Sequence, residues 1–238
     1  MPDPVLRWRS FTVPKDGHAP DECEDALAGD PAAGRFAIAD GASESYACGE
    51  WARLLVGAYV RTGAVGDWLA GPRAAWDREV GAQSLSWYAE EKFAIGAHAT
   101  FLGVTVTAGP GLATWEAVAA GDSCLILANG GSVAAAFPLA HSNEFTSAPT
   151  LVPSRGGPPP WRTASGALLP GEAILLATDA LAEALLESAE EGAFAGPVVM
   201  SLNAAGFGRW VQMARGFGRL RNDDVALGVI ELTEPGEQ

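Results

Sequence analysis

Short apolar runs, separated by glycine, proline and aspartate, alternate along the chain with stretches of helical periodicity. The β-prone runs predict strands at 5–13, 36–39, 100–107, 113–119, 124–128, 132–137, 173–178 and 225–232. Apolar residues that recur at helical spacing between Trp51 and Tyr59 predict a first helix. A second helical stretch after Gly71-Pro72 would place Trp76, Val80 and Trp87 on one core-facing side. Further helices are expected over 180–190 and about 207–220.

The order of these elements indicates the fold class. Turn signals separate the four runs between Thr100 and Phe137, which predicts an antiparallel meander rather than a βαβ array. Strands, helices, more strands and a second helical group predict an α+β fold. In it, two antiparallel β-sheets form a central sandwich flanked by α-helices, in four layers (αββα). We expect one domain, 1–238. A dinucleotide-binding fold is disfavoured, because Gly206-Phe207-Gly208 lacks the third glycine and follows no strand.

Two stretches are expected to be loops. Residues 14–30 are polar, contain glycine and proline, and carry Glu24-Asp25. Residues 138–170 form a longer insert that includes Pro158-Pro159-Pro160. Because long irregular segments inside a compact domain usually have a function, we expect this insert to lie near a cleft and to influence substrate choice.

Bulk composition narrows the class of protein. At 238 residues, 48% hydrophobic and 18% charged, the chain is expected to be globular. Its net charge of −14 argues against nucleic acid or an anionic membrane as the main partner. No run is long enough to cross a bilayer, and no secretory signal is evident. The three cysteines match neither a disulfide framework nor a zinc site, so we expect reduced thiols in a cytoplasmic, monomeric protein.

Acidic residues recur beside the strand-like runs. Asp40-Gly41 follows 35–39, Thr178-Asp179 follows 173–177, and Asn222-Asp223-Asp224 precedes 225–230. Glu24-Asp25 and Gly121-Asp122-Ser123 complete the series. A carboxylate at the end of a buried strand is costly unless a cation meets it. Several such ends that converge would form an oxygen-rich site for hard divalent metal ions.

In this order, the signatures resemble the motifs of the metal-dependent serine/threonine protein phosphatases of type 2C, the PPM family. The resemblance runs from Glu24 to Ile230. Ala97-His98-Ala99-Thr100 is similar to the family's Gly-x-Thr strand start, and Thr178-Asp179-Ala180 is similar to its Ser-Asp-Gly motif. Asp223-Asp224 is similar to its terminal Asp-Asn motif. The resemblance implies a divergent, bacterial-type phosphatase that acts on phosphoserine or phosphothreonine in proteins.

The resemblance also implies roles for individual residues. The cofactor would be Mn²⁺ or Mg²⁺, as two or three ions, and a water between two of them would attack phosphorus directly. The implied metal ligands are Glu24, Asp25, Asp40, Gly41, Asp122, Asp179, Glu183 and Asp223. Of these, Asp40 would bridge two ions and would carry the catalysis together with Asp179 and Asp223. Glu24 and Asp25 would act mostly through water, and Asp122, Asp179 and Glu183 would hold the third, weaker ion.

The chain departs from the family pattern at several positions. The family's phosphate-gripping arginine before the first acidic pair falls near Pro20, so Lys15 or His18 would have to supply the cation. Ala42 stands where some members have a histidine. Ala180 replaces a glycine and Asp224 an asparagine, which leaves the ligands Asp179 and Asp223 in place.

Three alternatives are compatible with parts of this pattern. The first is a catalytically weak or inactive phosphatase-fold protein that binds a phosphoprotein or a partner kinase. The second is a serine hydrolase, because Gly121-Asp122-Ser123-Cys124-Leu125 is similar to one esterase nucleophile block. It lacks a late histidine base, since His141 is the last histidine, and Gly41-Ala42-Ser43-Glu44-Ser45 lacks the final glycine of a nucleophile elbow. The third is that each aspartate only caps a turn or helix.

Overall fold

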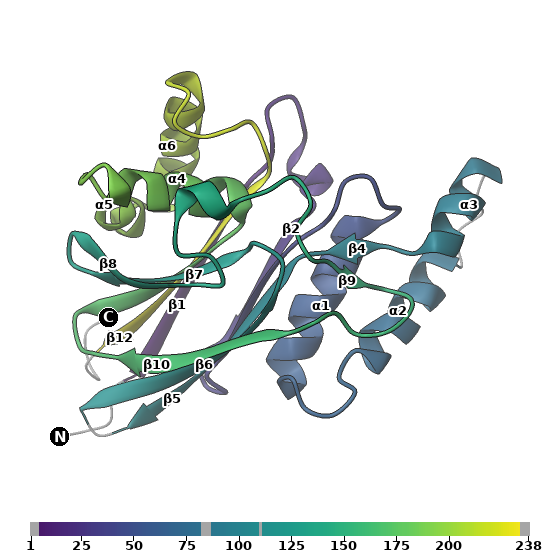
Figure 1. Cartoon of the computed structure of the whole chain (residues 1–238), viewed down its shortest axis with the longest axis horizontal. Helices are drawn as coiled ribbons and strands as arrows, with labels where there is room; N and C mark the ends of the chain where they lie inside the picture. Colours follow the sequence, from purple (N-terminus) through teal and green to yellow (C-terminus); the bar gives the residue numbers. More distant parts are fainter. Residues whose placement is uncertain (1–4, 82–86, 110, 234–238) are drawn as a thin grey trace.

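Two five-stranded antiparallel sheets lie face to face in the computed structural model, which describes residues 5–81, 87–109 and 111–233 (Figure 1). In order, the first sheet contains β1 (Val5–Val13), β12 (Val225–Thr233), β11 (Glu172–Ala177), β7 (Cys124–Asn129) and β8 (Ser132–Phe137). In order, the second contains β10 (Arg162–Leu168), β6 (Leu112–Ala120), β5 (Phe101–Gly109), β3 (Arg35–Asp40) and β2 (Asp25–Asp30). A short pair, β4 (His98–Ala99) and β9 (Val152–Pro153), lies beside them.

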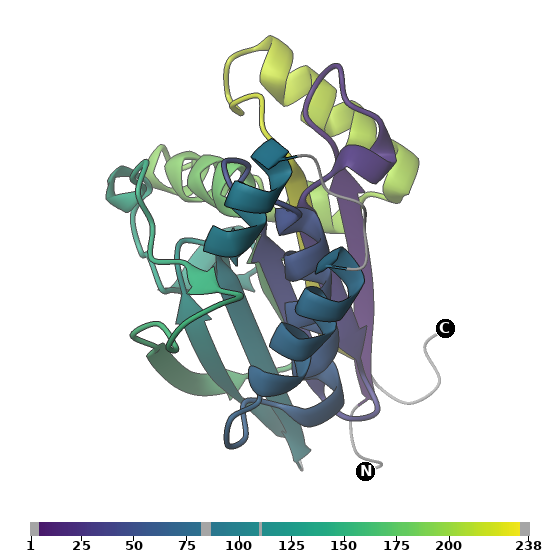
Figure 2. The ribbon, with the colours of Figure 1, turned by 90° about the vertical axis from the view of Figure 1, so that its right-hand side faces the viewer.

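Helices cover both outer faces of the sandwich. The first sheet carries α4 (Asp179–Glu190), α5 (Gly196–Ser201) and α6 (Ala204–Gly216). The second carries α1 (Cys48–Thr62) and α2 (Ala70–Gly81), with α3 (Trp87–Ile95) beside them, and the turned view looks onto this group (Figure 2). Two single turns of 3₁₀ helix complete the elements, at Pro20–Glu22 and Ser142–Glu144. The predicted α+β sandwich with flanking helices is confirmed.

Three apolar cores correspond to the three interfaces between layers. Between the sheets, side chains from alternate strand positions interdigitate, among them Phe36, Leu102 and Ile174. The outer cores join α4 and α6 to the first sheet and α1 and α2 to the second. Central strands such as β11 are buried on both faces, which explains why 173–177 is a continuous apolar run. No helix in the described ranges is long and apolar enough to span a bilayer.

The predicted meander between Thr100 and Phe137 is wrong. The β5–β6 hairpin belongs to the second sheet, whereas β7–β8 belongs to the first, so the chain changes sheets at Gly121-Asp122-Ser123. Gly121 makes this crossing possible. Its φ of 104° favours glycine, and a Cβ at this position would lie 2.6 Å from the Cβ of Thr100.

Other elements also differ from the expectation. Residues 25–30, expected to be loop, form the edge strand β2, and the 138–170 insert contains β9 and the edge strand β10. The sequence did not reveal the edge strands, because small and polar residues at half-exposed edge positions give little hydrophobic pattern. The short α5 was not predicted, and α6 begins at Ala204 because the Asn203 side chain caps it. Trp76 and Val80 are buried in α2 as expected, but the side chain of Trp87 lies outside the described part.

Candidate functional site

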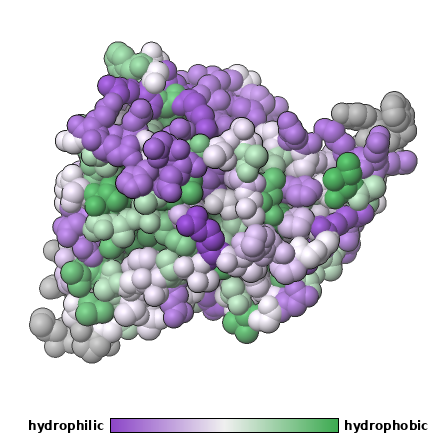
Figure 3. Space-filling view, in the orientation of Figure 1, coloured by the Kyte–Doolittle hydropathy of each residue, from purple (hydrophilic) through white to green (hydrophobic). Residues whose placement is uncertain are grey.

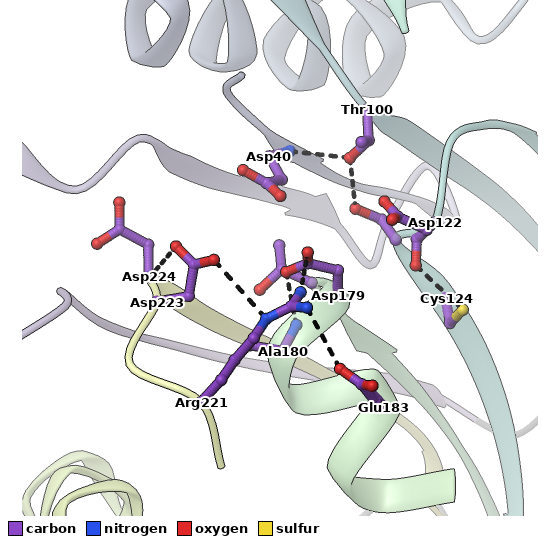
Figure 4. Close-up of polar contacts among 12 residues, drawn as sticks. Asp40, Thr100, Asp122, Cys124, Asp179, Ala180, Glu183, Arg221, Asp223 and Asp224 are labelled. Atoms are coloured by element: carbon purple, nitrogen blue, oxygen red, sulfur yellow. Dashed lines mark hydrogen bonds and ion pairs between the residues drawn. The ribbon is translucent and has the colours of Figure 1, made fainter. Parts of the chain in front are cut away.

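Acidic side chains from both sheets converge at one end of the sandwich. Asp40 ends β3, Asp122 lies in the turn between β6 and β7, Asp179 begins α4, and Asp223 precedes β12. These four residues line a cleft of about 730 Å³ (Figure 4). Residues 42–46 and part of the 138–170 insert, at 146–149 and 151, form its walls. Hydrophilic side chains also gather over the neighbouring α4 on the surface (Figure 3).

Asp25 and Asp40 lie directly opposite each other on paired strands β2 and β3. Like charges in this arrangement repel. The Thr178 hydroxyl donates to Asp25 Oδ2 at 2.8 Å and accepts from the Ala226 amide at 2.9 Å, which ties the two sheets together. Asp25 is 6% exposed, and its Oδ1 has no hydrogen-bond partner in the described structure. Burial, and then neighbouring carboxylates, raise the pKa of both Asp25 and Asp40 well above the usual range.

Asp122 is a second buried carboxylate. It is 5% exposed, and its Oδ1 also lacks a hydrogen-bond partner within the described ranges. Burial and, after it, the charge of Asp179 raise the pKa of Asp122 to about 7. The turn that carries it is fixed by neighbouring hydroxyls, because Thr100 Oγ1 lies 2.7 Å from Ser123 Oγ and accepts from the Asp40 amide at 3.3 Å. The structure therefore couples the positions of Asp40 and Asp122.

Gly41 and Glu24 are not among the residues that line the cleft. A Cβ on Gly41 would lie 2.8 Å from the carbonyl carbon of Cys48, so only glycine fits without a shift of the backbone. The Gly41 amide donates to the Glu24 carbonyl at 3.2 Å. The Glu24 carboxylate accepts from the Ser43 hydroxyl and from Cys48 Sγ, and it lines a separate hollow of about 550 Å³. The structure thus does not place the Glu24 side chain on the cleft.

The two predicted phosphate-binding residues also lie outside the cleft. Lys15 Nζ is 3.6 Å from Glu24 Oε2, and His18 is an exposed residue 4.0 Å from Glu22. Among the described residues that line the cleft, the cationic side chains are Lys92 and Arg221. Sequence reasoning missed both. Arg221 had one available signal, namely its position two residues before the acidic pair Asp223-Asp224.

Arg221 forms ion pairs with three of the predicted metal ligands. Its Nη2 pairs with Asp179 Oδ2, its Nη1 lies 3.3 Å from Glu183 Oε2, and its Nε lies 3.8 Å from Asp223 Oδ2 (Figure 4). The pKa of Asp223 is nevertheless raised, first by burial and then by the charge of Asp179. The guanidinium therefore supplies one positive charge where three carboxylates meet.

The donor set fits hard divalent ions in its chemistry. All the side-chain donors are carboxylate oxygens, which Mg²⁺ and Mn²⁺ prefer, and Asp25 and Asp122 each present a buried oxygen with no described partner. As the side chains stand, however, no group of three or more His, Cys, Asp or Glu residues within the described ranges could hold a metal ion. The ion pairs of Arg221 explain part of this arrangement. They direct the carboxylates of Asp179 and Glu183 toward the guanidinium and not toward a common ion position.

Asp224 is a structural carboxylate that sequence reasoning did not identify. It is 5% exposed, and its two oxygens accept the backbone amides of Lys15 and Glu24, each at 2.8 Å. Arg215 holds the adjacent backbone, since its guanidinium donates to the Asp223 carbonyl at 2.5 Å and to the Pro14 carbonyl at 3.0 Å. An aspartate at this position thus joins the strand that follows it to the N-terminal loop.

Replacing Asp224 with asparagine should lower the free energy of unfolding by about 1–3 kcal/mol. The amide can accept only one of the two backbone N–H groups and turns its own NH₂ toward the other. Urea denaturation in EDTA measures the change. Asp67→Asn, at an exposed position that does not line the cleft, is the control and should leave stability unchanged. Equal stability of Asp224→Asn and the wild type would contradict the structural role.

The serine-hydrolase alternative is not supported by the geometry. Ser123 is 1% exposed, and its described hydrogen bond is to the Thr100 hydroxyl, with no histidine partner among the described contacts. A buried hydroxyl without a base cannot act as an activated nucleophile. Cys23, Cys48 and Cys124 are free and buried.

No protein-family model and no curated protein matches the chain. Among solved structures, it is similar to PppA, a regulatory component of the type VI secretion system in Pseudomonas aeruginosa (TM-score 0.64, 19% identity, 96% of this chain and 98% of that chain covered). It is also similar to the catalytic domain of the serine/threonine phosphatase PstP, in complex with two manganese ions (0.62, 16%, 97% and 100%). A third match is the PPM phosphatase MsPP from Mycobacterium smegmatis, in complex with cacodylate (0.62, 19%, 96% and 99%). The chain therefore has the fold of the bacterial metal-dependent serine/threonine phosphatases of the PPM (type 2C) family, as a divergent representative of that fold.

Proposed function

We propose that this protein is a metal-dependent phosphatase that hydrolyses phosphoserine or phosphothreonine in proteins. The observation that carries the proposal is the convergence of Asp25, Asp40, Asp122, Asp179 and Asp223 at one end of the sandwich. They come from five different segments of the chain. Aspartates that only cap separate turns would not need to converge. The convergence raises the pKa of several of these carboxylates, and bound cations would offset this cost.

The chain's own residues would hold and orient the ions. Asp25, Asp40, Asp179 and Asp223 are the proposed ligands, with Asp122 and Glu183 at the side of α4. Thr178 keeps the Asp25 carboxylate in place, and Thr100 keeps the backbone of Asp40 in place. When bound, Mn²⁺ or Mg²⁺ would supply an activated water and charge compensation for in-line attack on phosphorus. No covalent nucleophile from the protein is needed.

The substrate we propose is a phosphorylated segment of another protein. Residues 42–46, 146–149 and 151 form walls of the cleft, and we propose that an extended peptide lies along them next to the phosphate. We propose that the part of the 138–170 insert at 146–151 contacts residues next to the phosphorylated position and so affects substrate choice. We also propose that the protein is cytoplasmic, because free thiols suit a reducing compartment. We propose that it acts as a monomer.

A second candidate function is phosphoprotein or partner-kinase binding without turnover. The ion pairs of Arg221 with Asp179, Glu183 and Asp223 favour it, because they satisfy carboxylates that would otherwise need ions. The unpartnered oxygens of Asp25 and Asp122, which Arg221 does not reach in any described contact, favour catalysis instead.

The test is release of phosphate from a phosphothreonine peptide by the wild-type chain. We expect turnover with Mn²⁺, loss of turnover with EDTA, and recovery when excess Mn²⁺ is added. p-Nitrophenyl phosphate should be hydrolysed under the same conditions, and p-nitrophenyl acetate should not. Peptide binding without any Mn²⁺-dependent turnover would favour the second candidate function and remove the enzymatic one.

A further inference from the structure

Arg221 is the feature of the cleft that the proposed function leaves unexplained. Its guanidinium meets one carboxylate from the start of α4, one from the next turn of that helix, and one from its own loop. Three carboxylates around a single cation are the arrangement expected of an ion site, but here a side chain provides the cation. The Arg221 side chain is 43% exposed, so it can reach solvent if it leaves its partners.

We propose that Arg221 is a built-in counter-ion for Asp179, Glu183 and Asp223, three of the residues that the proposed function assigns as ion ligands, so that an ion can bind them only by displacing the guanidinium. The inference rests on the proposed function, because it takes these carboxylates as ion ligands. It adds that ion binding in this chain is a competition between Mn²⁺ or Mg²⁺ and the chain's own guanidinium.

The guanidinium and a divalent ion differ in the charge and the geometry that they offer to the carboxylates. The guanidinium brings a single, delocalised charge and fixed N–H geometry, whereas a divalent ion brings twice the charge and binds carboxylates directly. At low ion concentration the single charge of the arginine partly compensates Asp179 and Glu183, which limits the repulsion that buried Asp25, Asp40 and Asp122 already create. At high ion concentration the ion takes over the same role.

The backbone around Arg221 is held independently of its side chain. Arg215, whose side chain is 4% exposed, anchors the Asp223 carbonyl and the Pro14 carbonyl. Asp224 is anchored by the amides of Lys15 and Glu24. The Arg221 side chain can therefore leave the carboxylates without disturbing Asp223, which would stay available as an ion ligand.

Isothermal titration with Mn²⁺ tests the competition. The matched variants are Arg221→Gln and Arg219→Gln. Arg219 lies on the same loop, is 63% exposed and pairs with Glu191 outside the cleft. We expect Arg221→Gln to bind Mn²⁺ about tenfold more tightly than the wild type, because the competent, arginine-free site is then always populated. Arg219→Gln should bind like the wild type.

Thermal unfolding gives a second readout that does not depend on activity. In EDTA, Arg221→Gln should melt below the wild type, because its carboxylates lose their counter-ion. In saturating Mn²⁺ this difference should vanish or reverse. A role of Arg221 that is only structural would lower the melting temperature equally in both conditions, and that outcome would overturn the proposal.

The outcomes separate the two proposals. Equal Mn²⁺ affinity of the wild type and Arg221→Gln would overturn the competition and leave the phosphatase function standing, whereas Mn²⁺ binding by neither protein would overturn both. If Arg221→Gln does not fold, the wild type is titrated with Mg²⁺ and the Nε–Hε signal of Arg221 is followed by ¹⁵N NMR, with Arg221→Lys for assignment. The signal should move with ion occupancy, and an unchanged signal at saturation would overturn the proposal.

Discussion

Asp40→Asn should reduce Mn²⁺-dependent phosphate release by about a thousandfold or more, the largest loss expected from a single change in this cleft. Asp40 lies opposite Asp25 in the strand register. The negative charges of Asp122, Asp179 and Asp223 also act on it and help to raise its pKa. In the proposed function it would therefore be a ligand at the centre of the acidic cluster. An amide keeps the shape of the side chain but removes the charge that draws cations to this position.

The kinetics should be measured with a phosphothreonine peptide over a range of Mn²⁺ concentrations. Asp67→Asn, a change at an exposed residue that does not line the cleft, is the matched control and should retain full activity. Asp40→Asn should also remain folded, and in EDTA it should be more stable than the wild type because one repelled carboxylate has been removed. Equal turnover of Asp40→Asn and wild type would remove the enzymatic interpretation of the cleft.

In the absence of divalent ions, the protein should lose stability as the pH rises from about 4 to about 7. Burial raises the pKa of Asp122 from 3.8 to about 7 and raises the pKa of Asp25, Asp40 and Asp223 as well. Between these limits the folded protein binds more protons than the unfolded chain, so the free energy of unfolding falls with increasing pH. A difference of one in pKa corresponds to about 1.4 kcal/mol, so the titration of Asp122 alone should lower the free energy of unfolding by a few kcal/mol across this pH range.

Groups with the opposite shift do not cancel this trend. Asp16, Glu144 and Glu190 have lowered pKa values, because hydrogen bonds from side chains or backbone amides favour their charged forms. Their contribution to stability is complete above about pH 4.5 and is lost below it, so it does not change over most of the pH range in which the cleft aspartates titrate.

Melting temperatures measured from pH 4 to 7.5 in EDTA and in saturating Mn²⁺ check the prediction. Bound ions should remove the decline, because they stabilise the charged carboxylates and bind the folded state. Asp122→Asn is the matched variant and should show a shallower decline in EDTA, since it lacks one of the titrating groups. A melting temperature that is the same in EDTA and Mn²⁺ at pH 7.5 would contradict ion binding at this site.

Much of the fold could be predicted because its signals are local. The apolar runs at 173–177 and 225–230 are continuous, since β11 and β12 are buried on both faces, and each run carries an aspartate signature at one end. The edge strands β2 and β10 gave no comparable signal, because half-exposed positions tolerate Ala, Gly, Ser and Thr. The sequence also could not show that the β5–β6 and β7–β8 hairpins belong to different sheets. Two successive hairpins have the same local pattern whether they join one sheet or two.

The candidate site was predictable to a similar extent. The sequence pointed to Asp40, Asp122, Asp179 and Asp223, and the structure places all four on one cleft. It did not indicate that the Glu24 side chain would face Ser43 and Cys48, or that Lys15 would pair with Glu24. These positions depend on how the N-terminal loop packs against residues 222–224, just before β12, and a single sequence does not encode that contact in any local pattern.

The sequence by itself determined most of the central strands, the acidic residues at their ends, and the two-sheet, helix-flanked architecture that short apolar runs with intervening helices favour. Only the tertiary structure decided which charges meet. Asp224 accepts amides from residues 200 and 209 positions earlier, and Arg221 reaches Asp179 42 positions away. The physical reason is that secondary structure follows from neighbouring residues, whereas the electrostatic partner of a buried charge is selected by the packing of distant segments, which single-sequence patterns do not reveal.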